Sequence, residues 1–113
     1  MRAGEVTVMG TLFYDGSHFA LDDRLLAHLQ IIISLKLRRN EGFFISWTTG
    51  VDNGSGRHAI WIDNGVAIRL QFDGTRPPAI NREWAESLAM AANTNNGLVV
   101  TNERIEPAED LLT

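Results

Sequence analysis

Residues 22–39 run Asp-Asp-Arg-Leu-Leu-Ala-His-Leu-Gln-Ile-Ile-Ile-Ser-Leu-Lys-Leu-Arg-Arg, and this stretch determines the fold class. Its apolar residues recur at spacings of three and four, the period of one helix face. They are Leu25, Leu26, Leu29, Ile32, Ile33 and Leu37. The aspartates at its start suit the N-terminal end of a helix dipole, and the basic residues at its end suit the carbonyl end. The pattern predicts an amphipathic helix from Asp22 or Asp23 to about Arg39.

A second apolar face on this helix indicates a further contact. Ile31 and Leu35 lie off the main stripe, on a neighbouring face that also carries His28. A helix that is apolar on more than one face is either deeply buried or touches a partner. We therefore expect His28, Ile31 and Leu35 to form an interface, most simply in a homodimer.

Short segments rich in β-branched and aromatic residues flank the helix on both sides. Two precede it and three follow it: residues 5–13, 18–21, 43–48, 57–62 and 66–72. Asn64-Gly65, between the last two segments, is among the strongest signals for a two-residue hairpin. We therefore predict that these two segments pair antiparallel.

A second helix and a short strand complete the predicted order. Asn81 is suited to cap a helix over residues 82–93, and residues 98–101 are suited to form a strand. The order β-β-α-β-β-β-α-β predicts an α+β fold, a two-layer sandwich of a mainly antiparallel sheet with two helices on one face. The three tryptophans are expected in the core between sheet and helices: Trp47, Trp61 and Trp84.

The composition is that of an ordinary globular domain. Of 113 residues, 44% are apolar and 21% charged, so the chain can bury a core without a metal or disulfide. The absence of cysteine excludes a thiolate nucleophile and a Cys-type zinc site. No stretch approaches about 18 consecutive apolar residues, and no signal-peptide pattern is present. We expect a cytoplasmic protein without membrane contact, metal or cofactor, with one domain over 1–102 and an acidic, mobile tail over 103–113.

A glycine-rich loop is the first candidate for binding phosphate. It carries Gly54, Ser55, Gly56 and Arg57, whose backbone N–H groups and guanidinium could cradle an anion. The loop lacks the lysine and the following helix of a P-loop, so a plain loop between two strands explains it better.

The basic end of the first helix is the second candidate. Lys36, Arg38 and Arg39 could contact an acidic partner, although complementarity with the helix dipole also explains them. The net charge is −4, so a dominant phosphate-binding surface is not expected.

No constellation in the sequence points to catalysis. His18, His28 and His58 lack the spacing of a metal site, and Gly54-Ser55-Gly56 is too short for a nucleophile elbow. The sequence therefore predicts no catalytic residues and a non-enzymatic interaction module that forms homo-oligomers. The alternative is a nucleic-acid or nucleotide-binding accessory domain that uses the loop and the basic helix end.

Short motifs form a pattern over about residues 9–102. They are Met9-Gly10-Thr11-Leu12, Asp22-Asp23-Arg24, Leu26-Ala27-His28-Leu29, Lys36-Leu37-Arg38-Arg39, Ser46-Trp47, Gly54-Ser55-Gly56-Arg57, Ile60-Trp61, Pro78-Ala79-Ile80-Asn81-Arg82 and Ala92-Asn93. This pattern resembles a small uncharacterised domain family of actinobacteria and their phages. Automatic naming often gives such chains the label ATP-dependent DNA ligase, so the resemblance implies at most a role beside a ligase. Such ligases accept AMP on a lysine in Lys-x-Asp-Gly, whereas the sole lysine here, Lys36, lacks that motif, and self-adenylation is not expected.

Overall fold

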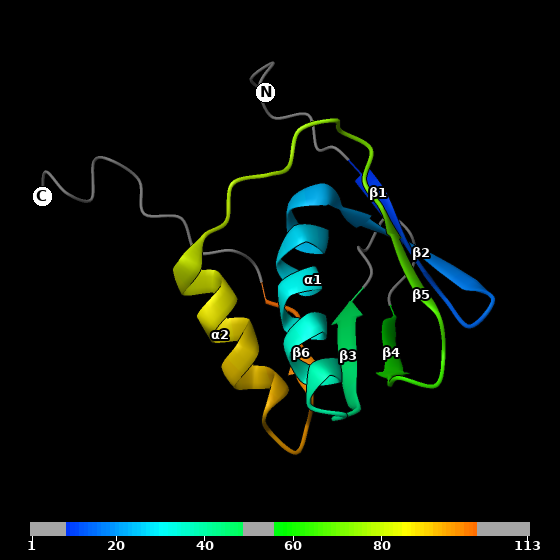
Figure 1. Ribbon diagram of the computed structural model, residues 1–113, viewed down its shortest axis with the longest axis vertical. Helices are drawn as coiled ribbons and strands as arrows, with labels where there is room; N and C mark the ends of the chain where they lie inside the picture. Colours follow the sequence, from blue (N-terminus) through cyan, green and yellow to red (C-terminus); the bar gives the residue numbers. More distant parts are fainter. Residues whose placement is uncertain (1–8, 49–55, 102–113) are drawn as a thin grey trace, which may run out of the picture.

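The computed structural model describes residues 9–48 and 56–101. Within them the elements follow the predicted order (Figure 1): β1 (Met9–Tyr14), β2 (Ser17–Asp22), α1 (Asp23–Arg38), β3 (Phe43–Thr48), β4 (Arg57–Ile62), β5 (Ile68–Gln71), α2 (Arg82–Ala92) and β6 (Leu98–Val99). The predicted α+β class is confirmed, since two helices accompany two mostly antiparallel three-stranded sheets in the described residues. The predicted tail over 103–113 lies outside the described residues.

Sheet A has the strand order β2-β1-β5, and all its strands are antiparallel. β1 and β2 form a hairpin that ends with Tyr14 opposite Ser17. Asp15 and Gly16 make the turn with φ of 52° and 82°, the left-handed conformation that a type I′ turn requires and that these residue types tolerate. β5 pairs with the other edge of β1, so two distant parts of the chain share one sheet.

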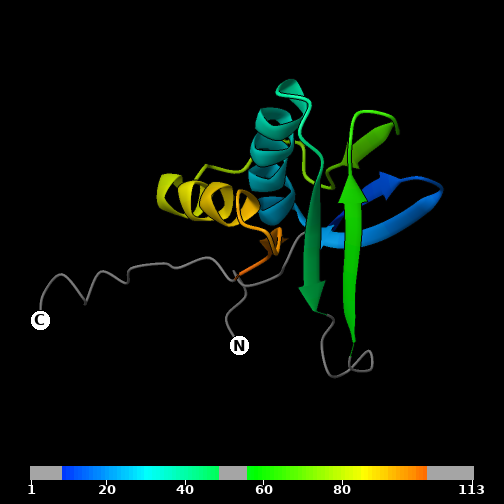
Figure 2. The same ribbon diagram turned by 90° about the horizontal axis from the view of Figure 1, so that it is seen from below.

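Sheet B has the strand order β4-β3-β6. β3 pairs antiparallel with β4, placing Phe44 opposite Trp61 and Thr48 opposite Arg57, and β6 pairs parallel with β3. Figure 2 shows the β1–β2 hairpin running across the direction of β3 and β4. The β-structure is therefore divided between two crossing sheets rather than held in the single sheet we expected.

The predicted hairpin at Asn64-Gly65 is wrong, because β4 and β5 belong to different sheets. The side-chain amide of Asn64 donates to the carbonyl oxygen of Leu37 at 2.8 Å and to Oδ1 of Asn40 at 2.8 Å, where α1 ends. Oδ1 of Asp63 accepts the N–H of Gly65 at 2.7 Å. These bonds hold the turn against the end of α1, and the chain leaves it to join sheet A.

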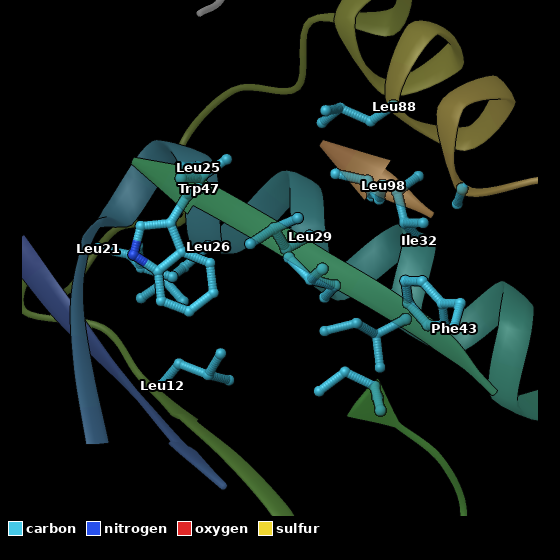
Figure 3. Packing of buried hydrophobic residues seen from close by; sticks show 14 of the residues in the cluster. Leu12, Leu21, Leu25, Leu26, Leu29, Ile32, Phe43, Trp47, Leu88 and Leu98 are labelled. Carbon is cyan, nitrogen blue, oxygen red and sulfur yellow. The ribbon is translucent and has the colours of Figure 1, made fainter. Parts of the chain in front are cut away.

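The core lies where α1 packs against sheet A and against α2, beside the inner face of sheet B (Figure 3). Leu21 and Leu26 gather beside Trp47, whereas Leu98 lies near Ile32 farther along α1. One cluster of buried side chains thus joins both sheets and both helices. Because α1 packs against sheet A on one side and against α2 on another, it is apolar over a wide arc.

The position of α2 corrects the predicted interface at His28. His28 is 0% exposed, and its ring centroid lies 4.5 Å from that of Trp84 on α2. Its Nε2 accepts the N–H of Asn81 at 2.9 Å, so this nitrogen carries no hydrogen, and Nδ1–H donates to the carbonyl oxygen of Arg24 at 2.7 Å. The imidazole links α1 to the start of α2, and the prediction that it faces a partner is wrong.

Candidate functional site

One face of sheet B points away from the core. Along β3, Phe43, Ile45 and Trp47 are buried, so the side chains between them project from the opposite face. Residues paired across neighbouring strands share a face, which extends this surface onto β4 and β6. We call it the open face of sheet B; it consists of Phe44, Ser46, Thr48, Arg57, Ala59, Trp61 and Val99.

An aromatic pair dominates the open face. The rings of Phe44 and Trp61 meet edge to face, with centroids 5.2 Å apart and an interplanar angle of 69°. Phe44 is 46% exposed, Trp61 48% and nearby Val99 49%. The prediction that all three tryptophans lie in the core is therefore wrong for Trp61, whereas Trp47 and Trp84 are buried.

The aromatic pair is held in place although it is half-exposed. A Cβ atom on Gly42 would come within 2.5 Å of the Trp61 ring, so only glycine lets the indole lie there. Gly97 has a φ of 77°, and a Cβ on it would come within 2.8 Å of the carbonyl oxygen of Phe44. The indole Nε1–H of Trp61 donates to Oδ2 of Asp63 at 3.0 Å. These contacts fix the positions of both rings.

Three cross-strand rows make up most of the open face: an aromatic row of Phe44 and Trp61, a middle row of Ser46 and Ala59, and an end row of Thr48 and Arg57. Val99 lies opposite Ser46, beside the middle row. The surface is bulky at one end and positively charged at the other, and between them the small side chains of Ser46 and Ala59 are flanked by the exposed Val99.

Phe44 was not among the site residues predicted from the sequence. Alternation along 43–48 is a usable signal for it, because burial of Phe43, Ile45 and Trp47 leaves Phe44 on the opposite face. The same alternation holds in β4, where Trp61 lies between Ile60 and Ile62 and so shares a face with Arg57. Its place opposite Phe44 depends on the register between β3 and β4, which no local pattern gives.

Only two residues of the glycine-rich loop candidate, Gly56 and Arg57, are among the described residues. Gly56 and Arg57 are exposed, and Arg57 belongs to the end row of the open face. Gly54 and Ser55 lie outside the described residues.

Lys36 does not form an exposed basic surface with its neighbours, contrary to the prediction. It is 9% exposed, its Nζ lies 3.1 Å from Oε1 of Glu41, and it donates to Oδ1 of Asn93 at 3.0 Å. Only Arg38 and Arg39 of that group are exposed. Lys36 instead ties the end of α1 to the end of α2.

The two basic candidates lie at opposite ends of sheet B. Asn64 follows the end of β4 and bonds to Leu37 near the end of α1, whereas Arg57 begins β4. A strand of six residues spans about 20 Å. Arg57 and the basic helix end therefore do not converge on one small anion.

Of the two other predicted interface residues, Ile31 and Leu35, only Leu35 is well exposed. Ile31 is half-buried and packs against the core, while Leu35 is 43% exposed. Without His28, this side of α1 offers a much smaller apolar patch than the sequence implied.

A cleft of about 380 Å³ opens between the β1–β2 hairpin and β4. Phe19, Ile60 and Val66 supply apolar lining, and Asp15 and Asp63 supply carboxylates. In residues 9–48 and 56–101, no group of three or more His, Cys, Asp or Glu side chains could hold a metal ion. Nor is any helix of that part of the chain long and apolar enough to cross a membrane.

Fold and surface together define a small α+β domain that presents an ordered aromatic surface on one sheet. Residues 9–103 match the model of a family described as a domain of unknown function, DUF7882, and the chain belongs to this family. The match agrees with the uncharacterised small domain that the short motifs indicated. Comparisons with curated proteins and with solved structures gave no match.

Proposed function

We propose that this chain is a non-enzymatic, cytoplasmic interaction module that forms homo-oligomers through the open face of sheet B. The ordered, half-exposed pair of Phe44 and Trp61 is the observation that carries the proposal. Aromatic side chains that are already ordered lose little conformational entropy when a partner covers them. Tryptophan in particular is enriched among the residues that dominate binding energy at protein interfaces.

The chemistry of the open face favours a protein surface over a polyanion. It carries a single cation, Arg57, and the carboxylate of Asp63 lies against the indole of Trp61. The whole chain has a net charge of −4. A surface that binds nucleic acid strongly would present several cations to successive phosphates.

Single substitutions of exposed apolar residues test which surface self-associates. Trp61→Ser removes the larger ring of the pair, and we expect it to raise the dissociation constant of the oligomer at least about tenfold. Leu35→Ser tests the exposed residue on α1, and Met90→Ser, on a side chain 73% exposed on α2, is the matched control. The mass of each variant is measured by light scattering and sedimentation over a range of concentrations, with folding checked by circular dichroism.

The open face of sheet B and the exposed side of α1 predict different effects of these substitutions on association. Weakened association in Trp61→Ser, with Leu35→Ser and Met90→Ser unchanged, supports the open face. Loss of association only in Leu35→Ser would move the interface to α1. A wild-type chain that stays monomeric at every concentration would overturn self-association altogether.

One observation favours the alternative of a nucleic-acid or nucleotide-binding accessory domain. Arg57 lies on the same face as Phe44 and Trp61, at the other end of β4, and a surface that carries both aromatic rings and a cation can bind a single strand by stacking its bases. Anisotropy of labelled single-stranded DNA and RNA, titrated at low and moderate salt, separates the two functions. Salt-sensitive binding that Trp61→Ser and Arg57→Ala both abolish would favour the accessory domain. A role of that domain beside a DNA ligase is what the resemblance of the short motifs implies.

A further inference from the structure

We infer that two copies of this chain pack their open faces with β3 and β4 antiparallel to the same strands of the other copy. The two-fold axis runs between the sheets and crosses the strands at the middle row, so Ser46 faces Ser46 and Ala59 faces Ala59. Trp61 of each copy then covers Arg57 of the other. The inference rests on the proposed function and adds to it the arrangement of the dimer and a role for Arg57.

The shape of the open face suits this arrangement. A symmetric dimer uses the same patch on both copies, so the patch must complement itself. A two-fold axis across the strands exchanges the end row with the aromatic row, and the bulkiest row of one copy meets the row at the opposite end of the other. The small side chains of Ser46 and Ala59 let the sheets approach at the centre, and facing sheets pack about 10 Å apart.

The charges of the open face suit the same arrangement. A guanidinium is attracted to the face of an indole ring, and this attraction strengthens when water is excluded. The carboxylate of Asp63, which accepts the indole N–H of Trp61, adds negative charge beside the position that Arg57 of the second copy would take. The chain already contains one such contact, since the guanidinium carbon of Arg69 lies 4.1 Å from the ring centroid of Phe13.

The competing two-fold arrangement is less favourable. An axis parallel to the strands would bring the aromatic rows together and would place both Arg57 side chains at the same end of the interface. Two like charges would then be desolvated near each other, with no aromatic face to receive them. Self-complementarity therefore favours the axis that crosses the strands.

Cross-linking of single cysteines distinguishes the two arrangements, because the chain contains no cysteine of its own. The full chain is made as Ser46→Cys, Ala59→Cys and Thr48→Cys and treated with a bis-maleimide that spans about 10 Å, the spacing of packed sheets. Each Thr48 lies two residues, or about 7 Å, from the axis, so the two copies of this position are about 14 Å apart along the strands. We expect Ser46→Cys and Ala59→Cys to cross-link and Thr48→Cys to fail, with Ala20→Cys on sheet A as the collision control.

A second measurement tests the role of Arg57. We expect Arg57→Ala to raise the dissociation constant about tenfold, because each dimer loses two cation–π contacts, whereas Arg38→Ala should leave it unchanged. A dimer in which Thr48→Cys cross-links as well as Ala59→Cys, or in which Arg57→Ala has no effect, overturns the arrangement and leaves the proposed function standing. A monomer under all conditions overturns both.

Discussion

Replacing His28 by phenylalanine tests whether the buried imidazole is a structural link between the two helices. Phenylalanine keeps an aromatic ring beside Trp84, whose centroid lies 4.5 Å away. It has no acceptor for the N–H of Asn81 and no donor for the carbonyl oxygen of Arg24. Because the side chain at this position is 0% exposed, bulk water does not take over either role.

The expected cost follows from the two hydrogen bonds. A buried donor that loses its acceptor costs about 1–3 kcal/mol, and the second bond adds up to about 1 kcal/mol. We therefore expect His28→Phe to lower the free energy of unfolding by about 2–4 kcal/mol. His28→Ala also leaves a cavity between the helices and should cost about 2 kcal/mol more. Both losses are large against the roughly 5–15 kcal/mol that stabilise a typical domain.

Urea denaturation, followed by tryptophan fluorescence and by circular dichroism, measures both variants against the wild type. His28→Gln is the matched control, because its amide oxygen can reach toward the N–H of Asn81, and its loss should be smaller than that of His28→Ala. If His28→Phe unfolds at the same urea concentration as the wild type, the imidazole does not stabilise the junction of α1 and α2, and the argument from its two bonds fails.

Two further substitutions test contacts that position the chain. Both oxygens of the buried carboxylate of Asp23 accept N–H groups, from Asp73 at 3.0 Å and Gly74 at 2.8 Å, so Asp23→Asn should cost about 1–2 kcal/mol in thermal melts. The exposed Asp73→Asn is its control, and equal melting of the two variants would show that the carboxylate is not needed. Gly97→Ala should cost more than about 1 kcal/mol because of its φ of 77° and the nearby carbonyl of Phe44. It should also weaken self-association, and a variant with unchanged mass and melting temperature would contradict the role given to this glycine.

The order of the elements could be predicted because it depends on short-range patterns. The helix predicted over residues 22–39 is observed as Asp23–Arg38, and Oδ1 of Asp22 accepts the N–H of Leu25 at 2.7 Å as a cap. The helix predicted over 82–93 is observed as Arg82–Ala92, capped by Asn81. A cap and an apolar period involve residues a few positions apart, so one sequence contains the whole signal.

Strand pairing could not be predicted in the same way, because contacts between distant segments select it. Asn64-Gly65 is a strong hairpin signal in isolation. In the structure, however, hydrogen bonds from Asn64 hold this turn against the end of α1, and the strands on either side of it do not pair. The candidate site was the hardest part to predict, because it depends on the pairing of β3 with β4. Alternation with Ile60 and Ile62 places Trp61 on the face of Arg57, but the pairing that brings its ring against Phe44 depends on the register between two strands.

The interleaving of the two sheets along the chain has a consequence for how the protein folds. In sheet A, β5 pairs with a hairpin that lies far before it in the sequence. In sheet B, β3 pairs with β6, which follows α2. Domains built on such distant contacts fold more slowly than helical bundles, because long loops must close before the contacts form. During synthesis, one edge of β3 stays unpaired until Leu98 and Val99 arrive, and an unpaired edge can recruit strands from other chains. Pairing of β6 with β3 thus also closes a route to aggregation.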